Sequence, residues 1–129
     1  MRPMKQYETI TRENIRRMVD HFYSQVLKDE LIADFFIDKL GDEMISDEWL
    51  HHLDLLRDFW ASIILGETAY RGQPIKPHLH MKGLKRESFE RWLKLFFQTI
   101  DKLYVKEQAD IFKNHSQKIA NNFMKLLNL

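Results

Sequence analysis

The sequence predicts an all-α protein, because apolar residues recur at helical spacing in four long segments and no segment alternates as a β-strand would. Glycine and proline gather in residues 66–77, where no helix can continue. With 129 residues and 44% hydrophobic side chains, the chain can bury one core, so we expect a single domain over residues 1–129.

The first long helix is expected to begin after Thr11, whose hydroxyl can cap it. Its inward face comprises Ile15, Met18, Val19, Phe22, Tyr23, Val26 and Leu27. A short apolar cluster, residues 31–36, is interpreted as one or two helical turns with Phe36 pointing inward. Leu40-Gly41-Asp42 then interrupts the pattern.

The second long helix is expected to run from a cap at Ser46 to Gly66, with Asp47 and Glu48 placed where the helix dipole favours acids. Its apolar face comprises Trp49, Leu53, Leu56, Phe59, Trp60, Ile63 and Ile64. His52 lies within this stripe, one turn before Leu56.

Three more helices are expected beyond residues 66–77. A short one covers residues 78–81 and ends before Gly83. A long one opens at Glu87 or Ser88. The last begins between Lys106 and Ala109. The inward residues are expected to be Phe89, Trp92, Leu93, Phe96, Ile100, Leu103 and Tyr104, then Phe112, Ser116, Ile119, Ala120, Phe123 and Leu127.

Charge and composition narrow the function. The net charge is +1 and the charges are interspersed, so no nucleic-acid surface is expected. The chain has no cysteine, which excludes disulfides, zinc–thiolate sites and iron–sulfur ligation. The first ten residues contain no apolar run, and no stretch approaches the roughly 20 apolar residues of a membrane span. We expect a cytoplasmic monomer without membrane partners.

Four polar or aromatic side chains could carry chemistry. His78 is either a solvent-exposed loop residue or a metal ligand, for which Pro77 fixes the approach. Tyr23, His52 and Trp92 face inward on three different helices, where each could simply be a core or boundary residue. Because buried polar groups need partners, a bound ligand that accepts hydrogen bonds would account for them together.

Other kinds of site find little support. His78 and His80 could begin a zinc site, but no further ligands follow at a usual spacing. Phosphate-loop, dinucleotide-binding and serine-hydrolase motifs are absent, and so are the paired Glu-x-x-His motifs of di-iron helical bundles.

The ordered set of these residues resembles the truncated haemoglobins, most closely their third group. The resemblance runs from about residue 7 to the C-terminus, and the glycine pairs of the other groups are missing. It is carried by Phe22-Tyr23, Phe36, Trp49, His52, Phe59-Trp60, the stretch 66–74, His78, Phe89 and Trp92. The fold implied is a two-over-two helical sandwich.

The resemblance also implies a cofactor and residue roles. His78 would be the proximal ligand of haem b, and Tyr23, His52 and Trp92 would lie on the distal side. The apolar wall would comprise Phe36, Leu56, Phe59 and Phe89. The open iron position would take O₂, NO, CO or a peroxide.

Tyr23 and Trp92 could both donate to bound O₂, which would slow its release. Tight binding suits scavenging, sensing or redox detoxification better than transport. Activity as an NO dioxygenase or peroxidase would need an external reductant, hence a reductase partner.

His52 is expected to be partly exposed, to titrate near neutral pH and to act as a gate. His80 could face a haem propionate or solvent. The alternative is a cofactor-free helical binding or regulatory module.

Overall fold

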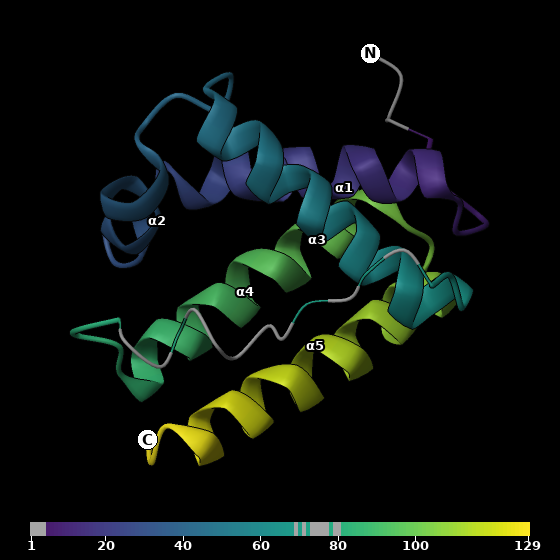
Figure 1. The fold of residues 1–129 in the computed structure, drawn as a ribbon. Helices are drawn as coiled ribbons and strands as arrows, with labels where there is room; N and C mark the ends of the chain where they lie inside the picture. Colours follow the sequence, from purple (N-terminus) through teal and green to yellow (C-terminus); the bar gives the residue numbers. More distant parts are fainter. Residues whose placement is uncertain (1–4, 69, 71, 73–77, 79–80) are drawn as a thin grey trace.

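The computed structural model describes residues 5–68, 70, 72, 78 and 81–129, and this part of the chain is helical (Figure 1). The described residues form five α-helices: α1 (Arg12–Val26), α2 (Ala33–Leu40), α3 (Asp47–Leu65), α4 (Arg86–Leu103) and α5 (Lys106–Leu126). The described residues contain no strand, only an isolated parallel bridge between Tyr7 and Tyr104. None of the described helices has the length and hydropathy of a membrane span.

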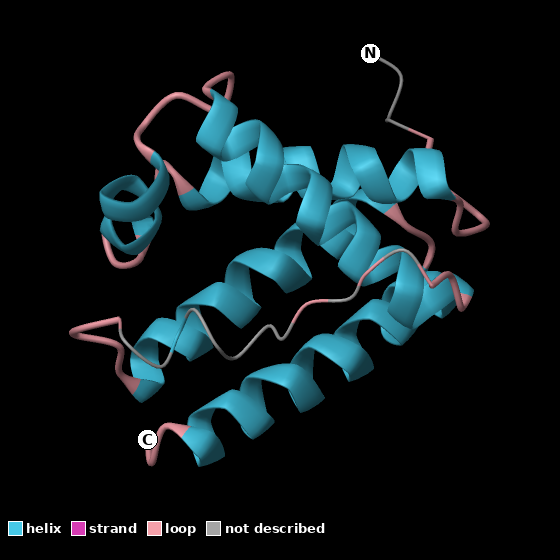
Figure 2. Cartoon of the chain, in the orientation of Figure 1, coloured by secondary structure: helices cyan, strands magenta, loops and turns pink. Residues whose placement is uncertain are grey.

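The four long helices form two packed pairs. α1 packs against α3 and α4 packs against α5, while α1 also contacts α4 and so joins the two pairs. Figure 2 shows the α1–α3 pair lying over the α4–α5 pair, with α2 at one end. The all-α, two-over-two sandwich predicted for this chain is therefore confirmed.

The expected helix ends are confirmed where the sequence carries a specific cap. The Thr11 hydroxyl accepts from the Asn14 N–H at 3.1 Å, and the Asn14 side chain accepts from the Thr11 N–H at 3.0 Å. The Ser46 hydroxyl caps α3, and Gly66 ends it with a left-handed φ of 72°. That conformation strains a residue with a Cβ, which is why glycine stands there.

The starts of α2 and α4 differ from expectation because side chains accept hydrogen bonds from nearby backbone N–H groups. The Asp29 carboxylate accepts from the N–H groups of Leu31 and Ile32, so α2 begins at Ala33 and continues to Leu40. The Ser88 hydroxyl accepts from the Lys85 N–H at 3.1 Å. Ser88 therefore lies inside the first turn of α4, which begins at Arg86, one or two residues before the expected start.

The expected short helix over residues 78–81 is only partly covered by the described residues. His78 lies in a 3₁₀ turn, and the Met81 N–H donates to the His78 carbonyl at 3.2 Å. Residues 79 and 80, between them, are outside the described part of the chain, as are Pro74 and Pro77.

Trp49 fixes α2 against the main body. Its side chain is fully buried in the core, and its indole N–H donates to the Gly41 carbonyl at 2.7 Å. Gly41 directly follows the last residue of α2. This bond ties the end of α2 to the first turn of α3, and it holds the face of α2 that carries Phe36 toward the core.

A buried polar network links the start of α1 to the end of α4, and it allows a stability prediction. The Asn14 side chain is 5% exposed; it accepts from the Tyr104 hydroxyl at 2.7 Å and donates to the Thr9 carbonyl at 2.9 Å. Asn14→Ala leaves these groups unpaired and should cost roughly 1–3 kcal/mol of unfolding free energy. Urea unfolding measures this, with exposed Asn122→Ala as control, for which we expect about 0.5 kcal/mol or less.

Candidate functional site

A cavity of about 550 Å³ opens between the helical pairs, within the range of roughly 300–1,000 Å³ typical of small-molecule and cofactor sites. Its wall is mostly apolar and aromatic. The described lining residues are Tyr23, Ile32, Phe35, Phe36, Lys39, Leu40, His52, Leu55, Leu56, Phe59, Trp60, Tyr70, His78, Met81, Leu84, Ser88, Phe89, Trp92, Ile119, Ala120 and Phe123.

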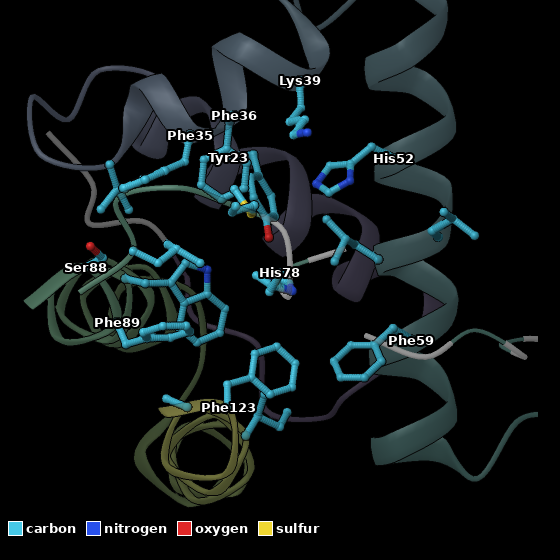
Figure 3. A pocket seen from close by; sticks show the side chains of 18 of the residues that line it. Tyr23, Phe35, Phe36, Lys39, His52, Phe59, His78, Ser88, Phe89 and Phe123 are labelled. Carbon is cyan, nitrogen blue, oxygen red and sulfur yellow. The ribbon is translucent and has the colours of Figure 1, made fainter. Parts of the chain in front are cut away.

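All eight residues singled out from the sequence line this one cavity. They are Tyr23, Phe36, His52, Leu56, Phe59, His78, Phe89 and Trp92. Figure 3 shows Tyr23, Phe36 and His52 along one side and Phe59, Phe89 and Phe123 along the other, with His78 between them in this view. Residues from three long helices, α2 and the α3–α4 connection therefore converge on the same space.

Tyr23 is the centre of an aromatic cluster on the first side. Its ring centroid lies 5.4 Å from those of Phe36 and His52 and 5.9 Å from that of Trp49. The contacts with Phe36 and His52 are edge-on, which brings positive ring edges to negative faces. This packing leaves the Tyr23 ring little freedom, so its hydroxyl is held toward the cavity (Figure 3).

The Tyr23 hydroxyl keeps its proton. Burial raises the pKa of Tyr23, and a hydrogen bond from the Trp92 side chain offsets only part of that rise. An indole N–H can only donate, so the Tyr23 oxygen is the acceptor in this contact. The Tyr23 O–H is then polarised and can donate to a further acceptor in the cavity.

His52 is partly exposed, as expected, but the expectation that it titrates near neutral pH is wrong. Burial, and after it the electrostatic influence of His78 and His51, lowers the pKa of His52 to about 4. Its ring lies between Tyr23 and Trp49, 5.4 Å from each, where these rings limit the solvation of an imidazolium. His52 is therefore neutral at physiological pH.

One atom of His52 has no partner among the described residues. Its Nε2 is buried and makes no hydrogen bond there. Leaving a buried polar atom unpaired costs roughly 1–3 kcal/mol, and such atoms in native structures usually await a ligand or water. This atom is thus the clearest mark that the cavity receives a molecule with a hydrogen-bonding group.

His78 enters the cavity from the connection between α3 and α4. Its ring centroid lies 5.0 Å from that of Phe123 on α5. His78 also lies close enough to His52 for its charge to affect the pKa of His52. Two imidazoles on separate elements thus share the cavity, while His80 lies outside the described residues.

The remaining aromatic wall is held by ring contacts. Trp92 stacks on Phe96 with an interplanar angle of 4° and a centroid distance of 5.3 Å. Phe59 meets Tyr70 edge-on at 5.3 Å, which joins α3 to the segment that leads to His78. These contacts make the two flanks of the cavity rigid.

Several lining residues were not singled out from the sequence. Ile119, Ala120 and Phe123 on α5 were assigned to the core by periodicity, because the side of a helix that faces a cavity is as apolar as one that faces other helices. Lys39 and Tyr70 gave no such signal. Only the placement of α2 and of the α3–α4 connection brings them to the cavity.

Comparison with known proteins agrees with this geometry. The family model for bacterial-like globins matches residues 5–125. The chain is 36% identical over 121 residues to the group 3 truncated hemoglobin ctb of Campylobacter jejuni, covering 94% of each chain. The crystal structure of group III truncated hemoglobin from Campylobacter jejuni superposes with a TM-score of 0.87 at 36% identity, covering 95% of both chains. The chain therefore belongs to the bacterial-like globins, as a haem globin of the group III truncated type.

Proposed function

We propose that the chain forms one haem-binding domain and that its cavity would hold haem b, with His78 as the residue that would bind the iron. The observation that carries this proposal is the convergence of His78, the unpaired Nε2 of His52 and the Tyr23 hydroxyl on one apolar cavity. The donor set fits the group, because a single imidazole is the ligand that haem iron takes in globins. Phe36, Leu56, Phe59 and Phe89 supply the apolar wall for the porphyrin.

Haem, when bound, supplies an iron with one open position for a diatomic gas. The chain supplies the surroundings. The Tyr23 hydroxyl would donate a hydrogen bond to the gas, and the Trp92 indole, which interacts with the Tyr23 oxygen, would strengthen that bond. The apolar wall excludes water from these bonds, which makes each of them stronger than it would be in solvent.

Such surroundings favour slow release of O₂. The protein is therefore suited to scavenging, sensing or redox detoxification of O₂, NO or peroxide, with CO as a further ligand, rather than to transport. Turnover as an NO dioxygenase or a peroxidase would require electrons from a reductase partner. The cytoplasmic location and the monomeric state stay predictions.

The test of haem binding is the Soret absorbance of the protein purified after expression with a haem precursor. A stoichiometric Soret band that shifts with CO supports the proposal. A protein that folds, shown by its helical circular dichroism, but takes up no haem even when haemin is added would overturn it. That result would favour the alternative, a cofactor-free helical binding or regulatory module.

His52 is proposed as a gate between the cavity and solvent. Minor rotamers are typically populated at about 10% or less, so removing a closed gate with His52→Leu should raise CO association about 10-fold. The dissociation rate should change less. Flash photolysis measures both, and His51→Leu, at the exposed neighbouring position, is the control.

The pH dependence of this gate follows from the lowered pKa of His52. Since the imidazole is neutral above about pH 4, association in the wild type should be constant between about pH 5 and 8. As the pH falls toward 4, the charged ring is expelled toward water and association should rise, whereas His52→Leu should show no rise. A large increase in dissociation with unchanged association would instead make His52 a direct donor to the ligand.

A further inference from the structure

Three polar lining residues have no part in the proposed binding of the gas or the iron: Lys39, Tyr70 and Ser88. Ser88 is 7% exposed, and its hydroxyl accepts from a backbone N–H in the cap of α4. The Tyr70 hydroxyl lies against its own segment, since a Cβ at Gly72 would be 2.6 Å from its oxygen. Of these three residues, only Lys39 has a polar group, its ammonium, whose contacts are still to be explained.

Lys39 is also the one lysine or arginine among the described lining residues, which include no carboxylate. It lies in the last turn of α2, three residues after Phe36 and so on the same face of the helix. Figure 3 shows its side chain extending from α2 beside the His52 ring, on the side of the cavity that holds Tyr23 and Phe36. A positive charge therefore stands at the rim of an otherwise apolar cavity.

No described carboxylate forms an ion pair with Lys39. Lys39 borders a second, outer hollow lined by Asp38, Asp42, Glu43 and Glu48, yet none of the ion pairs among the described residues includes Lys39. On α3, the residue one turn beyond His52 is Leu55, which lines the cavity and is 42% exposed. The described rim of α3 thus offers no competing cation beside His52.

We propose that the Lys39 ammonium pairs with a propionate carboxylate of the porphyrin, an inference that rests on the proposed haem binding. Haem is a flat apolar ring with two carboxylates at one edge. Burying the ring in the cavity leaves those carboxylates at the rim, where they stay hydrated and meet the cation. The pair would hold the porphyrin in one orientation and slow its escape.

The test is the rate of haem loss to an excess of apomyoglobin at low ionic strength. An exposed ion pair is worth roughly 0.2–1 kcal/mol, so Lys39→Met should accelerate loss about 1.4–5-fold, and Lys39→Glu, which adds repulsion, by about 10-fold. Lys39→Arg keeps the charge and should lose haem at the wild-type rate. Lys94→Met, at an exposed position of α4 away from the cavity, is the matched control and should change nothing.

The same measurements with haem dimethyl ester separate the ion pair from other effects. Lys39 also lies in the last turn of α2, where a positive charge interacts favourably with the helix dipole. Its replacement could therefore weaken α2 itself. A weakened helix would release both pigments faster, whereas loss of the ion pair leaves the rate for the ester unchanged. Added salt should likewise narrow the difference between variants for haem alone.

Equal acceleration for haem and its dimethyl ester would overturn the role of Lys39, as would unchanged haem loss in Lys39→Glu. The latter result would mean that Lys39 interacts with the carboxylates of the outer hollow instead. Neither outcome touches the proposed function, because in both the wild type still takes up haem and shows a Soret band. Failure of the proposed function is a different result, namely a wild type that binds no haem.

Discussion

His78→Ala should lose most of its haem during purification, whereas the wild type should retain a full complement. The iron needs one strong protein donor, and His78 enters the cavity beside Phe123, where the apolar wall alone must otherwise hold the porphyrin. The measurement is the ratio of Soret to protein absorbance, together with the ferrous spectrum. Full retention with an unchanged five-coordinate ferrous spectrum would show that another residue is the ligand.

His52 is the competitor that this experiment must exclude, because it is neutral, it lines the same cavity and its Nε2 has no partner among the described residues. If His78 is the ligand, His52→Ala should retain haem with an unchanged ferrous spectrum. Imidazole added to His78→Gly should restore haem binding, since the small side chain leaves room for the free ligand. His115→Ala, on α5 away from the cavity, controls for the loss of any histidine.

The sequence predicted the long helices well because their caps are local. Thr11, Ser46 and Gly66 act within one turn of the helix that they end, so a few residues decide the outcome. The starts of α2 and α4 were less predictable. The side chains of Asp29 and Ser88 accept hydrogen bonds from backbone N–H groups, and such bonds form in turns as well as at helix starts. Helix propensity therefore does not locate the first residue of either helix.

The candidate site could be assembled from the sequence only through the resemblance to a family. Periodicity places Tyr23, His52 and Trp92 on inward faces, but a core and a cavity produce the same pattern. The depressed pKa of His52 could not be foreseen, because it depends on the rings of Tyr23 and Trp49, which cover the imidazole. The position of Lys39 depends on where α2 docks, and no spacing within the chain encodes that.

Replacing the donors to the bound gas should have the second largest effect. A hydrogen bond to a polarised acceptor is worth roughly 1.5–3 kcal/mol, so Tyr23→Phe should speed O₂ dissociation about 10- to 100-fold. The substitution keeps the ring and its contacts with Phe36 and His52, so little packing is lost. Stopped-flow mixing of the oxygenated protein with CO gives the rate. A change below about two-fold in both Tyr23→Phe and Trp92→Phe would refute the hydrogen-bond model.

The double variant shows how the two donors act. If Tyr23 and Trp92 each bonded to O₂ independently, their effects on the dissociation rate would multiply. Trp92 acts on the Tyr23 hydroxyl and lowers its pKa, so we expect part of the effect of Trp92 to pass through the phenol. Trp92→Phe should then matter much less in the Tyr23→Phe background than in the wild type, and Tyr23→Phe should have the larger single effect. Multiplicative effects would instead place both donors directly on the ligand, with the indole turned away from Tyr23 once haem is bound.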